Sequence, residues 1–230
     1  RRDLRDRLIS LGYIGGQQSV STSRVGPDPK KMAFMTAPIG IAMEFMRKKL
    51  WNDAIVLYTK VLEVDPDNRI ALLQMARAQA ASGKIEAAVP YFEHAIGTYP
   101  DVEEFYRTYG MAYVAAGRLD QAQAIFKTAL AALPQSSHLH FLLGLARMTA
   151  RDWKGAIEEL DLAARLGKRA SRPHYLLAIC RVRLGDEAAA LASLDEYLRL
   201  EPNADRILRD PAFAPLMGRP AFQELIKKYL

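Results

Sequence analysis

Residues 83–100 read GKIEAAVPYFEHAIGTYP, and residues 117–134 repeat their pattern as GRLDQAQAIFKTALAALP. In both stretches the first glycine is followed by alanine after five residues, an aromatic after nine, alanine after twelve and proline after seventeen. The second stretch begins 34 residues after the first. Self-similarity at this period is typical of stacked helix-turn-helix units. The sequence therefore predicts a repeat array, in which each unit packs on its neighbours.

The same period extends over most of the chain. Prolines fall on one grid at Pro66, Pro100, Pro134 and Pro202, and Lys168 stands where the missing proline is expected. The grid defines five blocks, within which we number places from the first residue: 35–68, 69–102, 103–136, 137–170 and 171–204. Place 8 is small in every block: Ala42, Ala76, Gly110, Gly144 and Ala178. Place 20 is always alanine: Ala54, Ala88, Ala122, Ala156 and Ala190. Place 24 is large and apolar: Tyr58, Phe92, Phe126, Leu160 and Leu194.

This register resembles that of the tetratricopeptide repeat family. The resemblance implies an all-α fold, an α-solenoid of about five helix-turn-helix hairpins with a C-terminal capping helix. Small residues at places 8 and 20 allow two antiparallel helices to approach closely, and the large residue at place 24 fills the gap to the next block. We expect Gly83, Gly117 and Gly185 to end first helices and the grid prolines to end second helices. Departures from the pattern fall at Pro38, Lys49, Arg151 and Lys168. At the last of these, we expect the preceding Gly167 to end the helix in place of the missing proline.

Two flanking segments lie outside the repeat grid. Residues 1–16 predict a short amphipathic helix, and residues 17–34 have the polar, Ser-, Gly- and Pro-rich composition of a linker. Residues 205–230 contain apolar side chains that we expect to cover the last block: Ile207, Leu208, Phe213, Leu216, Phe222, Leu225 and Ile226.

The N-terminal stretch carries a second resemblance. Its matching residues are Leu4, Arg5, Leu8, Leu11, Gly12, Tyr13, Ile14, Gly15 and Gly16, followed by Asp28-Pro29-Lys30. They resemble the tail of bacterial sulfatase-type hydrolases that carry a tetratricopeptide array behind the catalytic domain. A plain N-terminal capping helix is the alternative interpretation. Because the chain opens with Arg1-Arg2, we expect a fragment or a processed chain.

Composition and charge favour a soluble protein without nucleic-acid binding. The formal charge is +6, but residues 1–31 hold seven basic and three acidic side chains and so supply +4 of it. A nucleic-acid binder normally concentrates Lys and Arg on one face of its folded part. No run of about 18 apolar residues is present to span a membrane. The sequence does not distinguish periplasm from cytoplasm, and the lone Cys180 predicts a small buried side chain.

The family resemblance implies a concave groove lined by the first helices, which would hold a peptide or a segment of a protein partner. Places 2, 5, 9 and 12 carry an apolar, Met-rich lining with an arginine fringe. The predicted lining residues are Ile39, Met43, Met46, Leu73, Arg77, Arg107, Met111, His138, Phe141, Leu145, Met148, Arg172, Tyr175 and Ile179, with Arg183 one place further along. The alternative is that several of them are buried, by the N-terminal segment folding back or by tight curvature of the superhelix. The family's Lys/Asn clamp for a C-terminal carboxylate is absent, because the corresponding places hold Ile39, Met43, Arg47, Leu73, Arg77 and Ala81.

The sequence offers little support for catalysis, and we predict no catalytic residue, no metal site and no cofactor. His140 and His174 occupy the same core place in successive blocks, which favours packing over metal binding. A basic cluster of Arg165, Lys168, Arg169, Arg172, Arg181 and Arg183 has two interpretations, recognition of an acidic peptide or lipid headgroups, or a solvated helix end. Our main hypothesis is therefore a non-catalytic protein-binding scaffold. The alternatives are a C-terminal appendage of a sulfatase-like metallohydrolase, serving positioning or oligomerisation, and self-association into a homo-oligomer.

Overall fold

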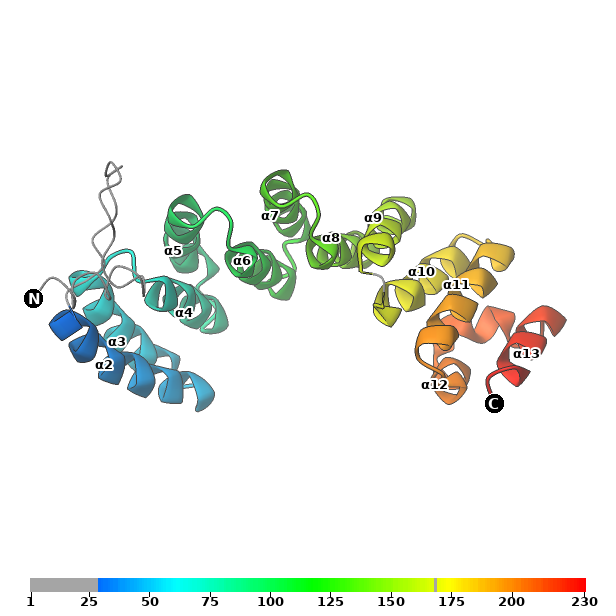
Figure 1. Ribbon diagram of the computed structural model, residues 1–230, viewed down its shortest axis with the longest axis horizontal. Coiled ribbons are helices and arrows are strands. Elements are labelled where there is room, and N and C mark those ends of the chain that lie inside the picture. Colours follow the sequence, from blue (N-terminus) through cyan, green and yellow to red (C-terminus); the bar gives the residue numbers. More distant parts are fainter. Residues whose placement is uncertain (1–28, 168) are drawn as a thin grey trace, which may run out of the picture. The chain divides into compact units, whose positions relative to one another are not determined.

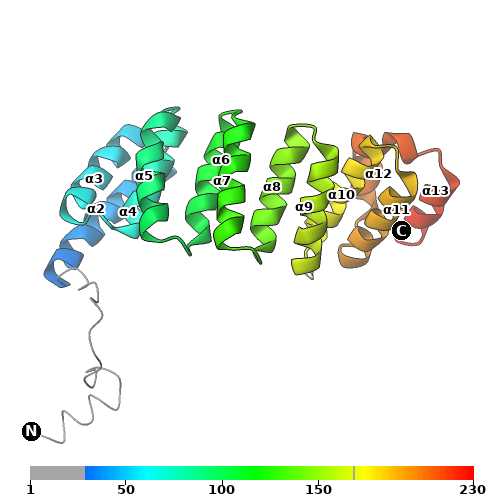
Figure 2. The ribbon, with the colours of Figure 1, turned by 90° about the horizontal axis from the view of Figure 1, so that it is seen from above.

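The structure, a computed structural model, describes residues 29–167 and 169–230, and these residues form helices and turns without any strand. The chain divides into two compact units at residue 34, and the description that follows concerns residues 35–230. Helix α2 (Pro29–Arg47) crosses that division. The all-α fold predicted from the repeat grid is confirmed, and successive helices lie side by side (Figures 1 and 2).

Each block contains two helices joined by a short turn. After α2, the helices follow in the order α3 (Trp51–Val64), α4 (Arg69–Ala81), α5 (Ile85–Thr98), α6 (Glu103–Ala115), α7 (Leu119–Ala132), α8 (Ser137–Thr149), α9 (Trp153–Leu166), α10 (Ser171–Arg183) and α11 (Glu187–Leu200). Even-numbered labels up to α10 are the first helices of their blocks, and odd-numbered labels up to α11 are the second helices. The second helices α3, α5, α7 and α11 end before their grid prolines. Helix α9 has no grid proline, and it ends at Leu166 with Gly167 as its C-cap.

The two helices of a block cross where their small residues meet. The alanines at place 20 are fully buried in all five blocks. At the third crossing there is no room for a side chain on Gly110, because an added Cβ would lie 2.4 Å from Cε1 of Phe126. At the fourth, a Cβ on Gly144 would lie 2.8 Å from Cγ of Leu160. The residue types at places 8, 20 and 24 therefore form one packing unit, as the sequence predicts.

Place 24 also joins one block to the next. Phe92 of α5 is fully buried and stacks on Tyr109 of α6, with ring centroids 4.6 Å apart and planes 13° from parallel. Both rings belong to one cluster of buried residues that continues through α7 and α8. Since no block buries its apolar face alone, each one depends on its neighbours for stability.

The turn after each first helix requires a left-handed backbone. Gly83, Gly117 and Gly185 adopt φ values of 83°, 73° and 75°. In the first and fourth blocks Lys49 and Arg151 hold the same turn at φ 60° and 63°. A side-chain-bearing residue in this region costs about 1–2 kcal/mol. The two departures noted in the sequence therefore keep the turn geometry at the expense of stability.

The flanks correct two details of the prediction. Helix α2 begins at Pro29, so residues 29–34 are helical and the expected linker over 17–34 is wrong for its last six residues. The physical reason is that proline suits the first position of a helix, where no N–H is needed, and Lys30–Met35 are good helix formers. The helix expected over 1–16 and the rest of the expected linker lie outside the described residues.

At the other end, the cap consists of three short helices, α12 (Ala204–Arg209), the 3₁₀ helix η1 (Pro211–Leu216) and α13 (Pro220–Lys227), and not of a single one. Pro211 and Pro220 each start a helix, and Asn203 and Asp210 cap α12 and η1 with their side chains. The cap buries five of the seven apolar residues expected to cover the last block, Ile207, Phe213, Leu216, Phe222 and Ile226. Leu208 is exposed and Leu225 half-buried.

The turn positions make a prediction with opposite signs. We expect Gly117→Ala to lower the free energy of unfolding by about 1 kcal/mol and Arg151→Gly to raise it by up to about 1 kcal/mol, since only the backbone strain changes. An added Cβ at Gly117 meets no atom within 4 Å, so a clash does not contribute. Gly97, inside α5 and equally open, is the matched control, and Gly97→Ala should stabilise by about 0.5 kcal/mol. Urea denaturation gives the free energy of unfolding of all three variants, provided that their m-values equal that of the wild type. If Gly117→Ala proves more stable than the wild type, the argument from backbone strain is wrong.

A second prediction concerns the helix crossing. Gly110→Ala should destabilise the protein by about 1–3 kcal/mol, because the ring of Phe126 occupies the space that the new methyl group needs. Adding Phe126→Leu reproduces the pair that the fifth block holds at Ala178 and Leu194, both fully buried. We therefore expect the double variant to lose less than the sum of the two single variants in a double-mutant cycle. Additive losses would show that the two positions do not share one space.

Candidate protein-binding surface

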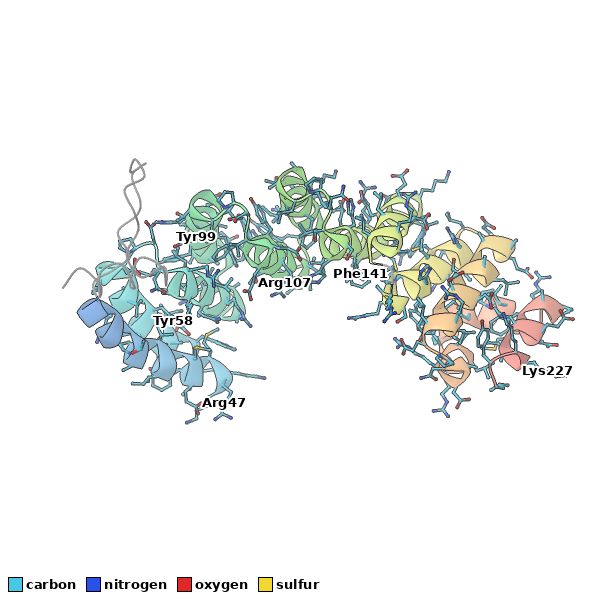
Figure 3. All side chains as sticks on the ribbon, in the orientation of Figure 1. Arg47, Tyr58, Tyr99, Arg107, Phe141 and Lys227 are labelled. Atoms are coloured by element: carbon cyan, nitrogen blue, oxygen red, sulfur yellow. The ribbon has the colours of Figure 1, made fainter. Side chains whose placement is uncertain are left out.

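The residues predicted to line a groove all lie on first helices. Successive first helices contact one another, α4 with α6, α6 with α8 and α8 with α10. Figure 3 labels Arg107 and Phe141 on two of these neighbours, α6 and α8. We call the solvent-accessible side of these helices the first-helix surface.

Most of the predicted residues are accessible on this surface. Met43 and Met111 are 50% and 37% exposed. The remaining polar members that are exposed are Arg77, His138, Arg172 and Arg183. The half-buried members are Ile39, Met46, Arg107, Phe141, Leu145 and Met148.

Leu73 is different, because it is only 7% exposed and packs in a cluster with Phe105 of the next block. It forms part of the wall of a pocket of about 230 Å³ that Met43, Ile70 and Val102 also line. Leu73 is therefore largely buried and contributes to the surface only as part of this pocket wall, and its role in binding stays a prediction. Phe105 at place 3 of the following block is large enough to cover it.

The last part of the first-helix surface is covered by the chain's own C-terminal cap. Tyr175 lies edge-on to Phe213 of η1 with centroids 5.7 Å apart, and its hydroxyl donates a hydrogen bond to a carboxylate oxygen of Asp210. The guanidinium of Arg206 lies 4.6 Å from the centre of the same ring. Ile179 packs against the same cap cluster. Burial, helped by the Asp210 carboxylate, raises the pKa of Tyr175 to about 12.

This covering limits how much of Tyr175 and Ile179 a partner can reach. Both side chains pack against the C-terminal cap, and the N-terminal segment suggested as the cause of occlusion lies largely outside the described residues. No periodic signal in residues 205–230 could have shown which face they cover. The accessible part of the surface on the later blocks is thus formed by α6, α8 and the first turn of α10.

A pocket lies between α8 and α10 within this accessible part. Its volume is about 340 Å³. Apolar walls come from Phe141, Ala163, Ala170 and Pro173, and polar or basic ones from Ser137, His138, Arg169, Ser171 and Arg172. The guanidinium of Arg172 lies 5.5 Å from the centre of the Phe141 ring, at the distance of a cation–π contact. We call this site the α8–α10 pocket.

Some charged side chains around this pocket have a polar partner among the described residues, and others do not. Glu103 accepts a hydrogen bond from Ser136 at 2.6 Å and contacts Nδ1 of His138 at 3.0 Å. Arg107 contacts Glu104 at 3.3 Å. Arg169 and Arg172, by contrast, form no ion pair with any residue that the structure describes. The N-terminal end of α10 adds to the positive potential, because its N-cap Ala170 offers no side-chain acceptor.

The basic cluster seen in the sequence does not form one patch. Arg181 points between second helices, where it contacts Asp161 at 3.3 Å and donates to Oγ of Ser193 at 2.5 Å. Arg165 lines a separate open pocket with Asp161 and His174. Of the described members, only Arg169 and Arg172 line the α8–α10 pocket.

Two further side chains with possible reactivity, His140 and Cys180, are buried. His140 is buried at its core place and contacts Glu159 at 2.8 Å, and Arg147 reaches the other oxygen of that carboxylate at 3.4 Å. Burial raises the pKa of the Cys180 thiol to about 11, which leaves it protonated and unreactive at neutral pH. In the described part of the chain, no three His, Cys, Asp or Glu side chains are placed to hold a metal ion. No described helix is long and apolar enough to cross a membrane.

Comparison with known families agrees with this geometry. Two models described as tetratricopeptide repeat match the chain, one over residues 46–89 and 80–146 and the other over residues 174–204. Together they cover more than half of the sequence. The chain belongs to the tetratricopeptide repeat family. The family resemblance stated for the repeat grid is thereby confirmed.

Several solved structures share the fold. MamA from Desulfovibrio magneticus RS-1, residues 41 to the end, is 20% identical with a TM-score of 0.59, and the match covers 76% of this tetratricopeptide repeat chain and 97% of that one. A crystal structure of MamA protein is 20% identical with a TM-score of 0.61, over 75% of this chain and 94% of that one. A comparison with curated proteins gives no match. At these identities the likeness concerns the fold alone.

The second resemblance, to the tail of sulfatase-type hydrolases, gains no support. Residues 4–16, which carry it, lie outside the described residues. None of the matching families and structures named above is a sulfatase.

Proposed function

We propose that this tetratricopeptide repeat protein is a non-catalytic scaffold that binds a segment of a protein partner on its first-helix surface. The binding region comprises α6, α8 and the first turn of α10. It holds Arg107, Met111, His138, Phe141, Leu145, Met148 and Arg172 of the predicted set. Met43, Met46, Arg77 and Arg183 extend the surface along α2, α4 and the end of α10.

The observation that carries this proposal is the row of apolar side chains on α6 and α8 that the fold leaves partly uncovered. Met111 is 37% exposed, and Phe141, Leu145 and Met148 are half-buried although their helix has a fully packed opposite side. Apolar side chains gathered on a surface and rimmed by charges are typical of protein-interaction sites. Methionine adapts to different partners, and aromatic residues with arginine supply most of the binding free energy in many interfaces.

The test replaces the accessible residues and leaves the cap intact. Arg107→Ala, Met111→Ala and Phe141→Ala in one variant should reduce capture of partner proteins from a lysate by tenfold or more, since hot-spot truncations cost about 2 kcal/mol or more each. A matched control carries Glu93→Ala, Gln121→Ala and Lys127→Ala, three exposed positions on second helices. Capture is measured by quantitative mass spectrometry of proteins bound to the immobilised chain.

Circular dichroism must show the same helix content and melting curve for both variants. If the folded triple variant retains the same partners at the same yield as the control, the first-helix surface does not bind them. Tyr175 is left unchanged, because its replacement would disturb the C-terminal cap and not only the surface.

A second candidate function rests on the sequence motif of residues 4–16 alone. In that case the array is the C-terminal appendage of a sulfatase-like metallohydrolase and positions or oligomerises it. The coding sequence upstream of Arg1 tests this directly, and a metal-binding hydrolase domain is the expected result. An upstream region that encodes a different domain would dismiss this candidate and leave the scaffold proposal untouched.

A further inference from the structure

The α8–α10 pocket has the size for part of a protein segment. Its volume of about 340 Å³ is at the lower end for ligand pockets, enough for one or two side chains. Phe141 and Pro173 provide apolar walls, and Ala163 and Ala170 keep the pocket open because their side chains are short. An aromatic or large aliphatic side chain fits these walls better than a polar one.

The rim of this pocket carries positive charge that nearby acids do not neutralise. Arg169 and Arg172 are exposed and lack an ion pair within the described part of the chain. Two acids on neighbouring elements have other partners. Glu103 is held by Ser136 and His138, and Glu201 accepts a hydrogen bond from Ser171 at 2.8 Å and lies 3.8 Å from Arg206.

Comparison between blocks shows that this charge is specific to one junction. Arg169 stands at place 33, where the other blocks have Asp67, Asp101, Gln135 and Asn203. Arg172 stands at place 2, where the other blocks have Thr36, Ile70, Glu104 and His138. The repeat fold therefore does not require arginine at either place. These two arginines make the rim of this pocket positive, and Arg172 also lies over the ring of Phe141.

We infer that the α8–α10 pocket binds an acidic protein segment. A Phe, Tyr, Trp or Leu side chain of the partner enters between Phe141 and Pro173, and an adjacent Asp or Glu pairs with Arg169 and Arg172. Guanidinium groups hold carboxylates with two parallel hydrogen bonds, which gives this pairing direction as well as strength. The inference rests on the proposed function and specifies the chemistry of the partner.

The same chemistry argues against other anions as the natural partner. Nucleic acid and anionic membranes are bound through many phosphates by a broad field of Lys and Arg. Here two arginines, which form no ion pair within residues 29–167 and 169–230, flank an apolar pocket, while Glu103, Glu104 and Glu201 lie on the surrounding elements. A short acidic segment with an apolar anchor matches that distribution.

Selection from a phage-displayed library of random dodecapeptides tests the inference directly, because the library itself supplies the candidate ligands. The targets are the wild-type chain, Arg169→Gln/Arg172→Gln, and a control, Lys127→Gln/Lys154→Gln, which removes the same charge from exposed positions on second helices. Wild type and control should enrich peptides with Asp or Glu beside an aromatic or leucine residue. The strongest of these peptides, labelled with fluorescein, should bind the arginine variant roughly tenfold or more weakly. Phe141→Ala should weaken the same peptide as well, and added NaCl should weaken its binding to wild type.

The possible failures are distinguishable. Enriched peptides that lack acidic residues, or that bind the arginine variant as tightly as wild type, overturn the acidic partner but leave the scaffold proposal standing. A library that yields no enriched peptide on any target counts against the proposed function itself. Binding of phosphatidylserine vesicles and of a single-stranded oligonucleotide is measured as well. If either binds more tightly than the best peptide, and only when both arginines are present, the pocket serves another class of ligand and the inference is refuted.

Discussion

The close crossing of two helices in every block is the constraint on which the structure depends. At that crossing a small residue at place 8 faces alanine at place 20, and the side chain at place 24 fills the remaining space. Gly110 under the ring of Phe126 shows how little room is left. Because the backbones approach so closely, the large side chains are available to pack on the next block, as Phe92 does on Tyr109. Stability therefore arises from contacts between neighbours and extends along the array.

Because the crossings are formed by places 8, 20 and 24, they place no demand on places 2, 5, 9 and 12 of the first helices. Places 2, 5, 9 and 12 hold side chains as different as those of Glu104, Met111, Phe141 and Arg172 without disturbing the crossings. Some of these places bind the chain's own C-terminal segment. At the last block Tyr175 and Ile179 bind the C-terminal cap, which closes the array with Phe213 and Ile207. The rest, on α6, α8 and the start of α10, remains accessible for a partner.

The fold was predictable from the sequence because the close helix crossing recurs in five blocks. The same type of residue therefore appears at the same place several times, with a constant spacing. The helix stops, the left-handed turns and the buried alanines all follow from that repetition. The site was predictable only in outline. Whether Leu73 is accessible depends on the size of Phe105 one block later, and the fate of Tyr175 depends on where a non-repeating cap folds. Single contacts of this kind leave no periodic trace. The positive charge of the α8–α10 pocket could be predicted only in part. The sequence shows a cluster of arginines, but it does not show that Arg165 and Arg181 lie apart from the two that line the pocket.

The junction between the fourth and fifth blocks shows how a repeat protein can change its surface without changing its fold. Lys168 replaces the closing proline there, yet α9 ends at the same place as the other second helices, with Gly167 as its C-cap where they have Asp65, Tyr99, Leu133 and Glu201. The φ of Gly167, −98°, is not left-handed, and an added Cβ would lie 3.1 Å from the carbonyl oxygen of Ala163 and 3.2 Å from Oγ of Ser137, so a larger residue would require a small shift of these neighbours. The turn hydrogen bond from the N–H of Ala170 to the carbonyl oxygen of Gly167 is kept at 2.7 Å, although the places around it carry Arg169 and Arg172. The fold therefore does not dictate the charge beside this pocket, and the proposed recognition of an acidic segment would make use of that freedom.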